Sequence, residues 1–134
     1  MKTKVAKIIG KFCQEISQLS NCKRAKQACV LSSLDGESIL AYGYNGDYRG
    51  GPNTCTGPNE PGKCECIHAE LNALIKTRLG QEFVVFITQS PCLPCAKLLI
   101  NSRCRYVYFM LRYRDESGII LLKNNNIGIE ELTL

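Results

Sequence analysis

The chain has a single histidine, which stands two positions before a glutamate in His68-Ala69-Glu70. A second run of reactive residues follows at Pro91-Cys92-Leu93-Pro94-Cys95. One imidazole and two thiolates are ligands that zinc prefers, and a catalytic zinc site keeps its fourth position for water. Zinc also lowers the pKa of bound water towards ~7, which makes a nucleophile available at neutral pH. These residue types therefore predict a catalytic zinc held by His68, Cys92 and Cys95.

Glu70 stands too close to His68 along the chain to be a comfortable further ligand. It can instead carry protons between the water, a substrate ring and a leaving group. The combination resembles the motif pair of zinc-dependent nucleobase deaminases, in which the glutamate has this role. The alternative is that each half is structural, as ordinary helix sequence and as half of a zinc knot. The presence of both halves, with Pro91 in place, favours the catalytic interpretation.

The composition is that of an ordinary globular protein, with 45% hydrophobic and 22% charged residues in 134. We expect a single domain over residues 1–134. No stretch approaches the ~20 apolar residues of a membrane span, and the N-terminus leads into a helical pattern without a signal-peptide core. We therefore expect a cytoplasmic protein (host cytoplasm if it is viral) without a membrane partner.

The formal net charge of +5 suits an anionic partner, either a nucleotide phosphate or a nucleic acid. The alternative is a basic surface with no such partner. Stacking aromatics for single-stranded nucleic acid are few, because the chain has no tryptophan and only four phenylalanines. The composition thus disfavours a nucleic-acid partner.

Helices and strands alternate along the chain, which predicts a three-layer α/β/α sandwich. Strands are expected over 28–33, 38–44, 83–88, 106–111 and 127–132, and the first two flank an Asp35-Gly36 turn. Helices are expected at 96–100 and 118–123. The N-terminal helix should present an apolar face made of Val5, Ile8, Ile9, Phe12, Cys13, Ile16 and Leu19. A helix that opens at His68 should end at Gly80 and bury Leu71, Leu74, Ile75 and Leu79.

Four cysteines outside the catalytic motif lie near or in a loop expected over 43–62: Cys22, Cys55, Cys64 and Cys66. Four thiolates are enough for a closed structural zinc site, and a metal would fix a long polar loop that cannot bury itself. The alternative is free thiols or one chance disulfide. Cys13, Cys29 and Cys104 fall in apolar runs and are expected in the core.

Three segments resemble the deoxycytidylate (dCMP) deaminase branch of the cytidine deaminase superfamily, with phage-encoded members nearest. They are Gly43-Tyr44-Asn45-Gly46, Ile67–Ala73 and Ser90–Lys97, and Tyr113-Arg114-Asp115 also fits. The resemblance implies a cytidine deaminase-like fold with a central mixed sheet of about five strands. Some viral members are similar at Cys22 and Cys55 too, which implies a second zinc. The resemblance also implies a homo-oligomer, as large as a hexamer.

The resemblance further implies the substrate contacts. Asn45 would bond the sugar, Ala69 would lie by the pyrimidine ring, and the backbone near Ser90 would accept from the exocyclic amine. Tyr113 matches a tyrosine near the nucleotide. Guanidinium groups suit phosphate, so Arg112 and Arg114 are the candidate phosphate ligands, although either can be a surface charge.

The leading hypothesis is a zinc-dependent hydrolase that converts dCMP to dUMP and releases ammonia. The first alternative is an editing deaminase that acts on tRNA or single-stranded DNA. The second is an inactive zinc module that binds nucleotides, which the presence of Glu70 disfavours.

Overall fold

The computed structural model describes residues 1–55, 57, 60 and 64–134. Part of the loop expected over 43–62, and residue 63 after it, lie outside the described residues. The elements follow one another in this order: α1 (Thr3–Ser17), β1 (Ala28–Ser32), β2 (Ile39–Tyr44), α2 (Ala69–Leu74), β3 (Phe83–Gln89), α3 (Leu93–Asn101), β4 (Cys104–Leu111), α4 (Ser117–Asn124) and β5 (Gly128–Glu131). No helix among the described residues combines the length and apolar character needed to cross a membrane.

The strands form one mixed sheet in the order β2-β1-β3-β4-β5. β1 pairs antiparallel with both β2 and β3, whereas β3, β4 and β5 run parallel. The parallel strands are joined by α3 and α4, as crossover connections require. The expected mixed five-stranded sheet is confirmed.

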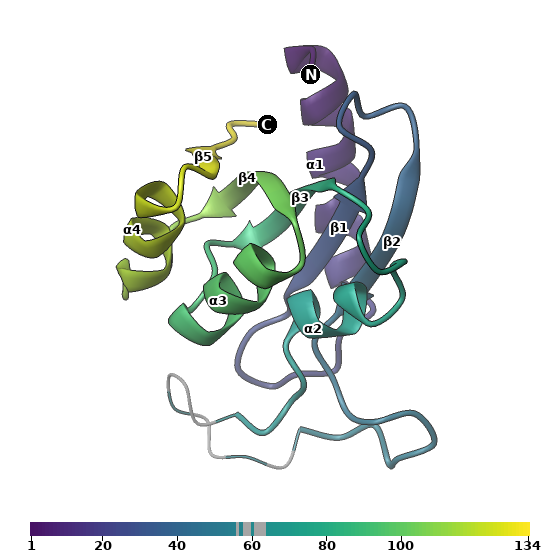
Figure 1. Cartoon of the computed structure of the whole chain (residues 1–134). Coiled ribbons are helices and arrows are strands. Elements are labelled where there is room, and N and C mark those ends of the chain that lie inside the picture. Colours follow the sequence, from purple (N-terminus) through teal and green to yellow (C-terminus); the bar gives the residue numbers. More distant parts are fainter. Residues whose placement is uncertain (56, 58–59, 61–63) are drawn as a thin grey trace.

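Helices cover both faces of the sheet (Figure 1), with α1 on one face and α2, α3 and α4 on the other. The strand residues alternate between two cores. Val30, Val84 and Phe86 pack with α1, whereas Leu31, Val85 and their neighbours pack with the three other helices. Both cores share the central strands β1 and β3, which are covered on both faces and are therefore apolar over most of their length. The three-layer α/β/α prediction is confirmed.

Helix α2 is shorter than predicted, and three of the four positions of its predicted buried stripe are wrong, whereas Leu74 is partly buried against the core. The helix ends at Leu74, and Leu71, Ile75 and Leu79 are exposed. Its buried face consists of Ala69, Glu70 and Ala73.

Gly43 explains why small residues of α2 face the sheet. A Cβ atom on Gly43 would lie 2.5 Å from the Ala73 nitrogen and 2.8 Å from the Ala69 oxygen. The backbone of α2 therefore rests directly on β2. The space between the helix and the strand is too small for leucine side chains.

The apolar face of α1 is also narrower than the sequence pattern predicts. Ile8, Phe12 and Leu19 are exposed, and the buried positions are Ala6, Ile9, Gly10, Cys13 and Ser17. The helix rests on the sheet through small residues, so bulky ones flank the contact. The expected core positions of Cys13, Cys29 and Cys104 are confirmed, since all three are buried.

Candidate active site

The three predicted zinc ligands meet where two helices begin. His68 precedes the first residue of α2, and Cys92 precedes the first residue of α3. Cys95 lies in the first turn of α3. Strand β3 delivers the chain to this point, and Pro91 and the Pro94 of the first turn favour a helix start. The positive end of the α3 dipole lies at both thiols and favours the thiolate form.

The ligand atoms have the separations that a tetrahedral zinc requires. His68 Nδ1 lies 3.3 Å from Cys95 Sγ and 3.6 Å from Cys92 Sγ. Zinc bonds of about 2.3 Å to sulfur and 2.0–2.1 Å to nitrogen place tetrahedral ligand atoms about 3.5–3.8 Å apart. These three side chains therefore fit a zinc ion, with one coordination position left for water or substrate.

The pKa values of the two cysteines are shifted in opposite directions. Hydrogen bonds from Cys95 and from His68 lower the pKa of Cys92 to about 4. The same contact with Cys92, together with burial, raises the pKa of Cys95. The hydrogen bond with Cys92 also raises the pKa of His68. The site is thus organised around negative charge on sulfur, which suits a divalent cation.

Glu70 is only 5% exposed and lies in the wall of the same pocket. Burial raises the pKa of its carboxyl group, while hydrogen bonds from its own backbone and from Cys95 act in the opposite direction. A carboxyl group in such a position is suited to accept and return a proton, as general acid–base catalysis requires.

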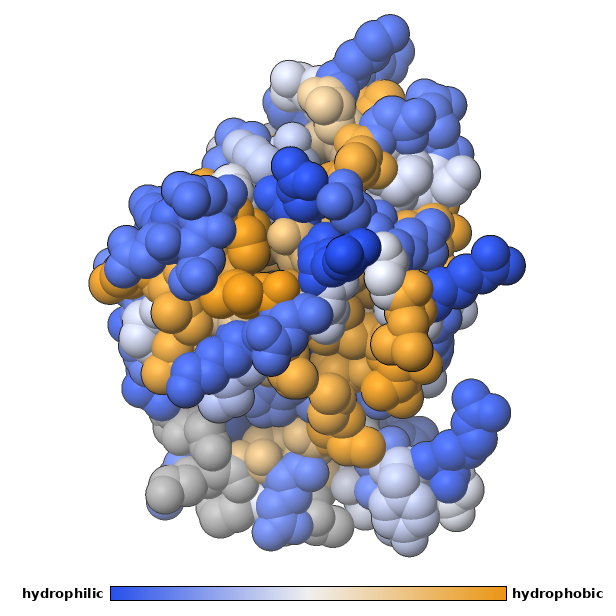
Figure 2. All heavy atoms as spheres, in the orientation of Figure 1, coloured by the Kyte–Doolittle hydropathy of each residue, from blue (hydrophilic) through white to orange (hydrophobic). Residues whose placement is uncertain are grey.

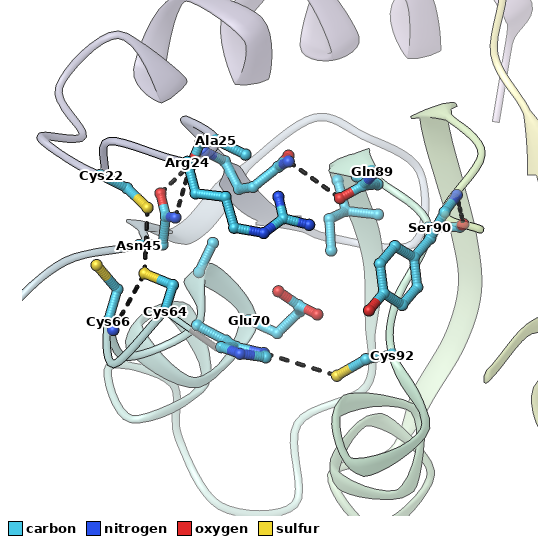
Figure 3. Close-up of a pocket in the computed structure, with 15 residues that line it drawn as sticks. Cys22, Arg24, Ala25, Asn45, Cys64, Cys66, Glu70, Gln89, Ser90 and Cys92 are labelled. Atoms are coloured by element: carbon cyan, nitrogen blue, oxygen red, sulfur yellow. Dashed lines mark hydrogen bonds between the residues drawn. The ribbon is translucent and has the colours of Figure 1, made fainter. Parts of the chain in front are cut away.

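The pocket lies at one end of the central strands (Figure 3). It is lined by residues that precede β1, that follow β2 and that lie at or after the ends of β3 and β4. Its wall includes His68, Glu70 and Cys92, and opposite them Arg24 and Gln89. The Arg24 side chain extends over the cavity towards the side that holds Glu70 (Figure 3). A cavity with a few converging polar groups beside a metal-binding set is the usual form of an active site.

The pocket contains four of the residues expected to contact substrate: Asn45, Ala69, Ser90 and Tyr113. Ala69 and Ser90 are buried, and the Ser90 hydroxyl accepts a hydrogen bond from the Tyr113 backbone at 2.7 Å. Strand β3 and the segment after β4 are therefore tied together beside the metal ligands.

Asn45 has a structural role that the sequence pattern did not reveal. Its side-chain oxygen accepts from Ser20 at 2.7 Å and from the Gln27 backbone at 2.9 Å. Its side-chain nitrogen donates to the Ala25 carbonyl at 2.8 Å. Among the described residues, the second hydrogen of this amide nitrogen has no partner. The neighbouring Gly46 pairs with Ile67, so Asn45 and the metal-binding segment lie side by side.

Arg112 and Arg114 are not brought to the pocket wall. Arg112 forms ion pairs with Glu116 at 2.7 Å and with Glu131 at 3.6 Å. Arg114 lies over the ring of Tyr113, 5.2 Å from its centroid. Both cations are occupied on the exposed side of this segment.

Sequence reasoning missed three polar residues of the pocket: Arg24, Gln27 and Gln89. They come from the segment before β1 and from the end of β3. Gln27 donates to Gln89 at 3.1 Å, so these two amides form one wall. The only available signal for Arg24 was its place two residues after Cys22.

The four remaining non-core cysteines converge on one point beside the pocket. Cys22 Sγ lies 3.8 Å from Cys55 Sγ and 3.2 Å from Cys64 Sγ, and Cys55 lies 3.2 Å from Cys64. The sulfur atoms of the whole set, including Cys66, lie within 4.8 Å of one another. A hydrogen bond from the Lys23 backbone lowers the pKa of Cys55 to about 7. These four thiols fit a closed tetrahedral metal site.

Comparisons with known proteins agree with this geometry. Residues 4–111 match the cytidine and deoxycytidylate deaminase zinc-binding region. The deoxycytidylate deaminase of Saccharomyces cerevisiae is 29% identical over 127 residues, and that of Schizosaccharomyces pombe is 31% identical over 112 residues. The matches cover 85% and 73% of this chain but only 40% and 34% of the two yeast proteins.

The fold is also similar along its whole length to a solved structure. The dCMP deaminase of cyanophage S-TIM5, in complex with dCMP and dUMP, is 33% identical, with a TM-score of 0.86. The match covers 98% of each chain. The apo form of the same phage protein gives a TM-score of 0.83 at 32% identity. With the motif residues assembled into one centre and this likeness over the full chain, the protein belongs to the deoxycytidylate deaminase family, whose members carry this zinc-binding region.

Proposed function

We propose that this chain catalyses the hydrolytic deamination of dCMP to dUMP, with release of ammonia. The main support for the proposal is one pocket that contains a metal-binding set, a buried carboxylate and an arginine that has no carboxylate partner among the described residues. His68, Cys92, Glu70 and Arg24 all line this cavity. The cyanophage relative, which was solved with dCMP and dUMP, supports the choice of substrate.

His68, Cys92 and Cys95 would hold the catalytic zinc. When bound there, zinc supplies an activated water at neutral pH and stabilises negative charge that develops on the substrate. The carboxylate of Glu70 would take one proton from the water and pass it to ring nitrogen N3. It would then take the remaining proton from the oxygen added at C4 and deliver it to the departing amine, which leaves as ammonia while the C4 carbonyl forms. Burial of Glu70 keeps bulk water away from these transfers.

Arg24 is the candidate ligand for the substrate phosphate. Its Nε donates to the Glu60 carbonyl at 3.0 Å. In the described part of the chain, neither terminal nitrogen of the guanidinium has a hydrogen-bond or ion-pair partner. A guanidinium fork with free donors matches phosphate oxygens.

The experiment is an ammonia-release screen of the zinc-loaded protein over dCMP, CMP, dCTP, deoxycytidine and a short single-stranded DNA. We expect dCMP to be the best substrate, with more than about tenfold preference over deoxycytidine, since tenfold requires only ~1.4 kcal/mol. Equal use of the nucleoside would contradict the phosphate subsite. Preference for the oligonucleotide would favour an editing deaminase, and no turnover with any substrate would favour an inactive nucleotide-binding module.

We further propose a second, structural zinc on Cys22, Cys55, Cys64 and Cys66. Their convergence supports it, since a closed Cys₄ set is a common structural zinc site. Elemental analysis of the purified protein should give two zinc ions per chain. A ratio of one in the fully active protein, with Cys64 and Cys66 open to thiol reagents, would reject the second site.

The functional protein is, in this proposal, a homo-oligomer as large as a hexamer whose unit is a single domain over 1–134. Apolar side chains are exposed on the face that carries α2 and α3 (Figure 2). They include Leu71, Ile75 and Leu79. A second copy of the chain would cover such a surface.

The cytoplasm is the compartment that we propose. All nine cysteines are unpaired, and disulfides are rare in the reducing cytosol.

A further inference from the structure

We propose that the four-cysteine cluster (Cys22, Cys55, Cys64 and Cys66) positions Arg24 and so sets the affinity for the substrate phosphate. The proposal rests on the function proposed above. The cluster would then influence substrate selection in addition to stabilising the fold.

Arg24 lies in a connecting segment without regular secondary structure, between the end of α1 and the start of β1. A flexible arginine in such a segment would lose conformational entropy on binding phosphate. Fixing the segment in advance removes part of that cost, so the contacts that hold the backbone around Arg24 determine how well it binds.

The cluster holds the segment on its N-terminal side. Cys22 is a member of the cluster and stands two residues before Arg24. The intervening residue is held too, because the Lys23 backbone N–H donates to the Cys55 sulfur. Three consecutive residues therefore connect the cluster to the guanidinium in the pocket. Figure 3 shows Cys22 and Cys64 beside the segment from which the Arg24 side chain extends.

Asn45 holds the segment on its C-terminal side. It bonds the Ala25 carbonyl and the Gln27 backbone N–H at 2.8 and 2.9 Å. Arg24 thus lies between two fixed points of the backbone. One is held by hydrogen bonds of the Asn45 side-chain amide, and the other by the thiols of the cluster. Thiols are weak hydrogen-bond partners, whereas a metal bound to four thiolates contributes its binding free energy to the local structure. Metal in the cluster would convert the weaker anchor into a rigid one.

Cys55 is the position at which to test this coupling, because it belongs to the cluster and is not part of the pocket wall. We expect Cys55→Ser to raise KM for dCMP about tenfold, the order of effect that one well-placed charged contact gives, and to leave kcat/KM for deoxycytidine within twofold of wild type. Elemental analysis should show zinc falling from two ions to one. Calorimetry should show weaker binding of inorganic phosphate. Cys13→Ser is the matched control, since Cys13 is buried in the core under α1 and should leave all four measurements unchanged.

A double-mutant cycle separates positioning from a general structural effect. If the cluster acts through Arg24, Cys55→Ser should have no further effect on the dCMP to deoxycytidine ratio in an Arg24→Gln background. Equal losses on both substrates, or an additive loss in the double mutant, would overturn the proposal.

Lys23→Gly is the second variant, for the case in which Cys55→Ser does not fold. It keeps all four cysteines and two zinc ions but loosens the connection to Arg24, so the dCMP to deoxycytidine ratio should fall severalfold. An unchanged ratio would overturn the proposal. Failure of the proposed function is distinguishable, because zinc-loaded wild type would then release no ammonia from any substrate, while phosphate calorimetry on the same variants would still report the coupling.

Discussion

At the scale of single residues, the proposed site assigns metal binding and proton transfer to two side chains that are close in the sequence. His68 offers a ring nitrogen to the thiol pair, whereas Glu70, two residues later, is buried in the pocket wall. His68 lies before the first residue of α2 and Glu70 lies within the helix, so the two side chains point in different directions. The carboxylate is therefore available for the proton transfer that we propose.

Replacement of Glu70 by glutamine should remove proton transfer and keep the shape of the side chain. We expect turnover to fall by ~100-fold or more, the order that general acid–base catalysis contributes. Zinc content, measured by elemental analysis, and the melting temperature should stay near those of wild type. Near-normal turnover in a zinc-loaded variant would remove Glu70 from the mechanism.

Arg24→Gln should reduce kcat/KM for dCMP by about tenfold or more, because a charged hydrogen bond to phosphate is lost. The rate with deoxycytidine should not change. Arg112→Gln is the control, since Arg112 is paired with Glu116 and Glu131 away from the pocket. Steady-state kinetics with dCMP and deoxycytidine measure both effects. A larger loss of kcat/KM for dCMP in the Arg112 variant would indicate that the phosphate ligand lies in the segment after β4.

The metal ligands were predictable from sequence because each half of the centre is local. His68 and Glu70 are two residues apart, and Cys92 and Cys95 flank one helix start. Arg24 was not predictable in the same way. Its position depends on how an irregular segment folds against residues that are distant in the sequence, such as Glu60 and Asn45, and no local pattern encodes such contacts.

At the scale of elements, the centre depends on close approaches that only glycine allows. Gly43 lets α2 rest on β2, and Gly118 lets α4 begin beside Pro91. A Cβ atom on Gly118 would lie 2.2 Å from the Pro91 oxygen. Each contact lies beside a helix start that carries a candidate metal ligand, His68 before α2 and Cys92 before α3. The strands were predictable to within one or two residues because their apolar runs are distinct. The end of α2 was not, since its apolar pattern continues through exposed positions.

Gly43→Val should therefore destabilise the protein through a clash with backbone atoms of α2 that cannot move aside. We expect a loss of roughly 1–3 kcal/mol, the usual cost of overpacking, visible as a lower midpoint in urea denaturation. Gly46→Ala is the control, because nothing lies within 4 Å of the added Cβ there. Equal stability of the two variants would contradict the close packing of α2 on β2.

At the scale of the whole molecule, one sheet with helices on both faces supports a pocket at the ends of its central strands. The same fold leaves some apolar side chains exposed on the surface. Ile75 and Leu79 follow the end of α2 and are among the most exposed apolar residues. Large exposed apolar residues near one another are typical of contact surfaces.

Ile75→Glu should disrupt the proposed homo-oligomer, because it places a charge on the surface that a second copy would cover. Light scattering coupled to size-exclusion chromatography should show a smaller assembly than wild type. Leu134→Glu changes an exposed apolar residue on the opposite side of the sheet, next to α1, and should leave the assembly intact. A monomeric wild type would contradict the proposal.

Deamination of dCMP in this pocket can be measured directly by incubating dCMP with the zinc-loaded wild-type protein and quantifying dUMP and ammonia together. We expect dUMP and ammonia to form in equal amounts, chelation of zinc to abolish both, and Glu70→Gln to form neither at a comparable rate. Zinc-loaded, folded protein that binds dCMP and returns it unchanged would rule out the proposed function.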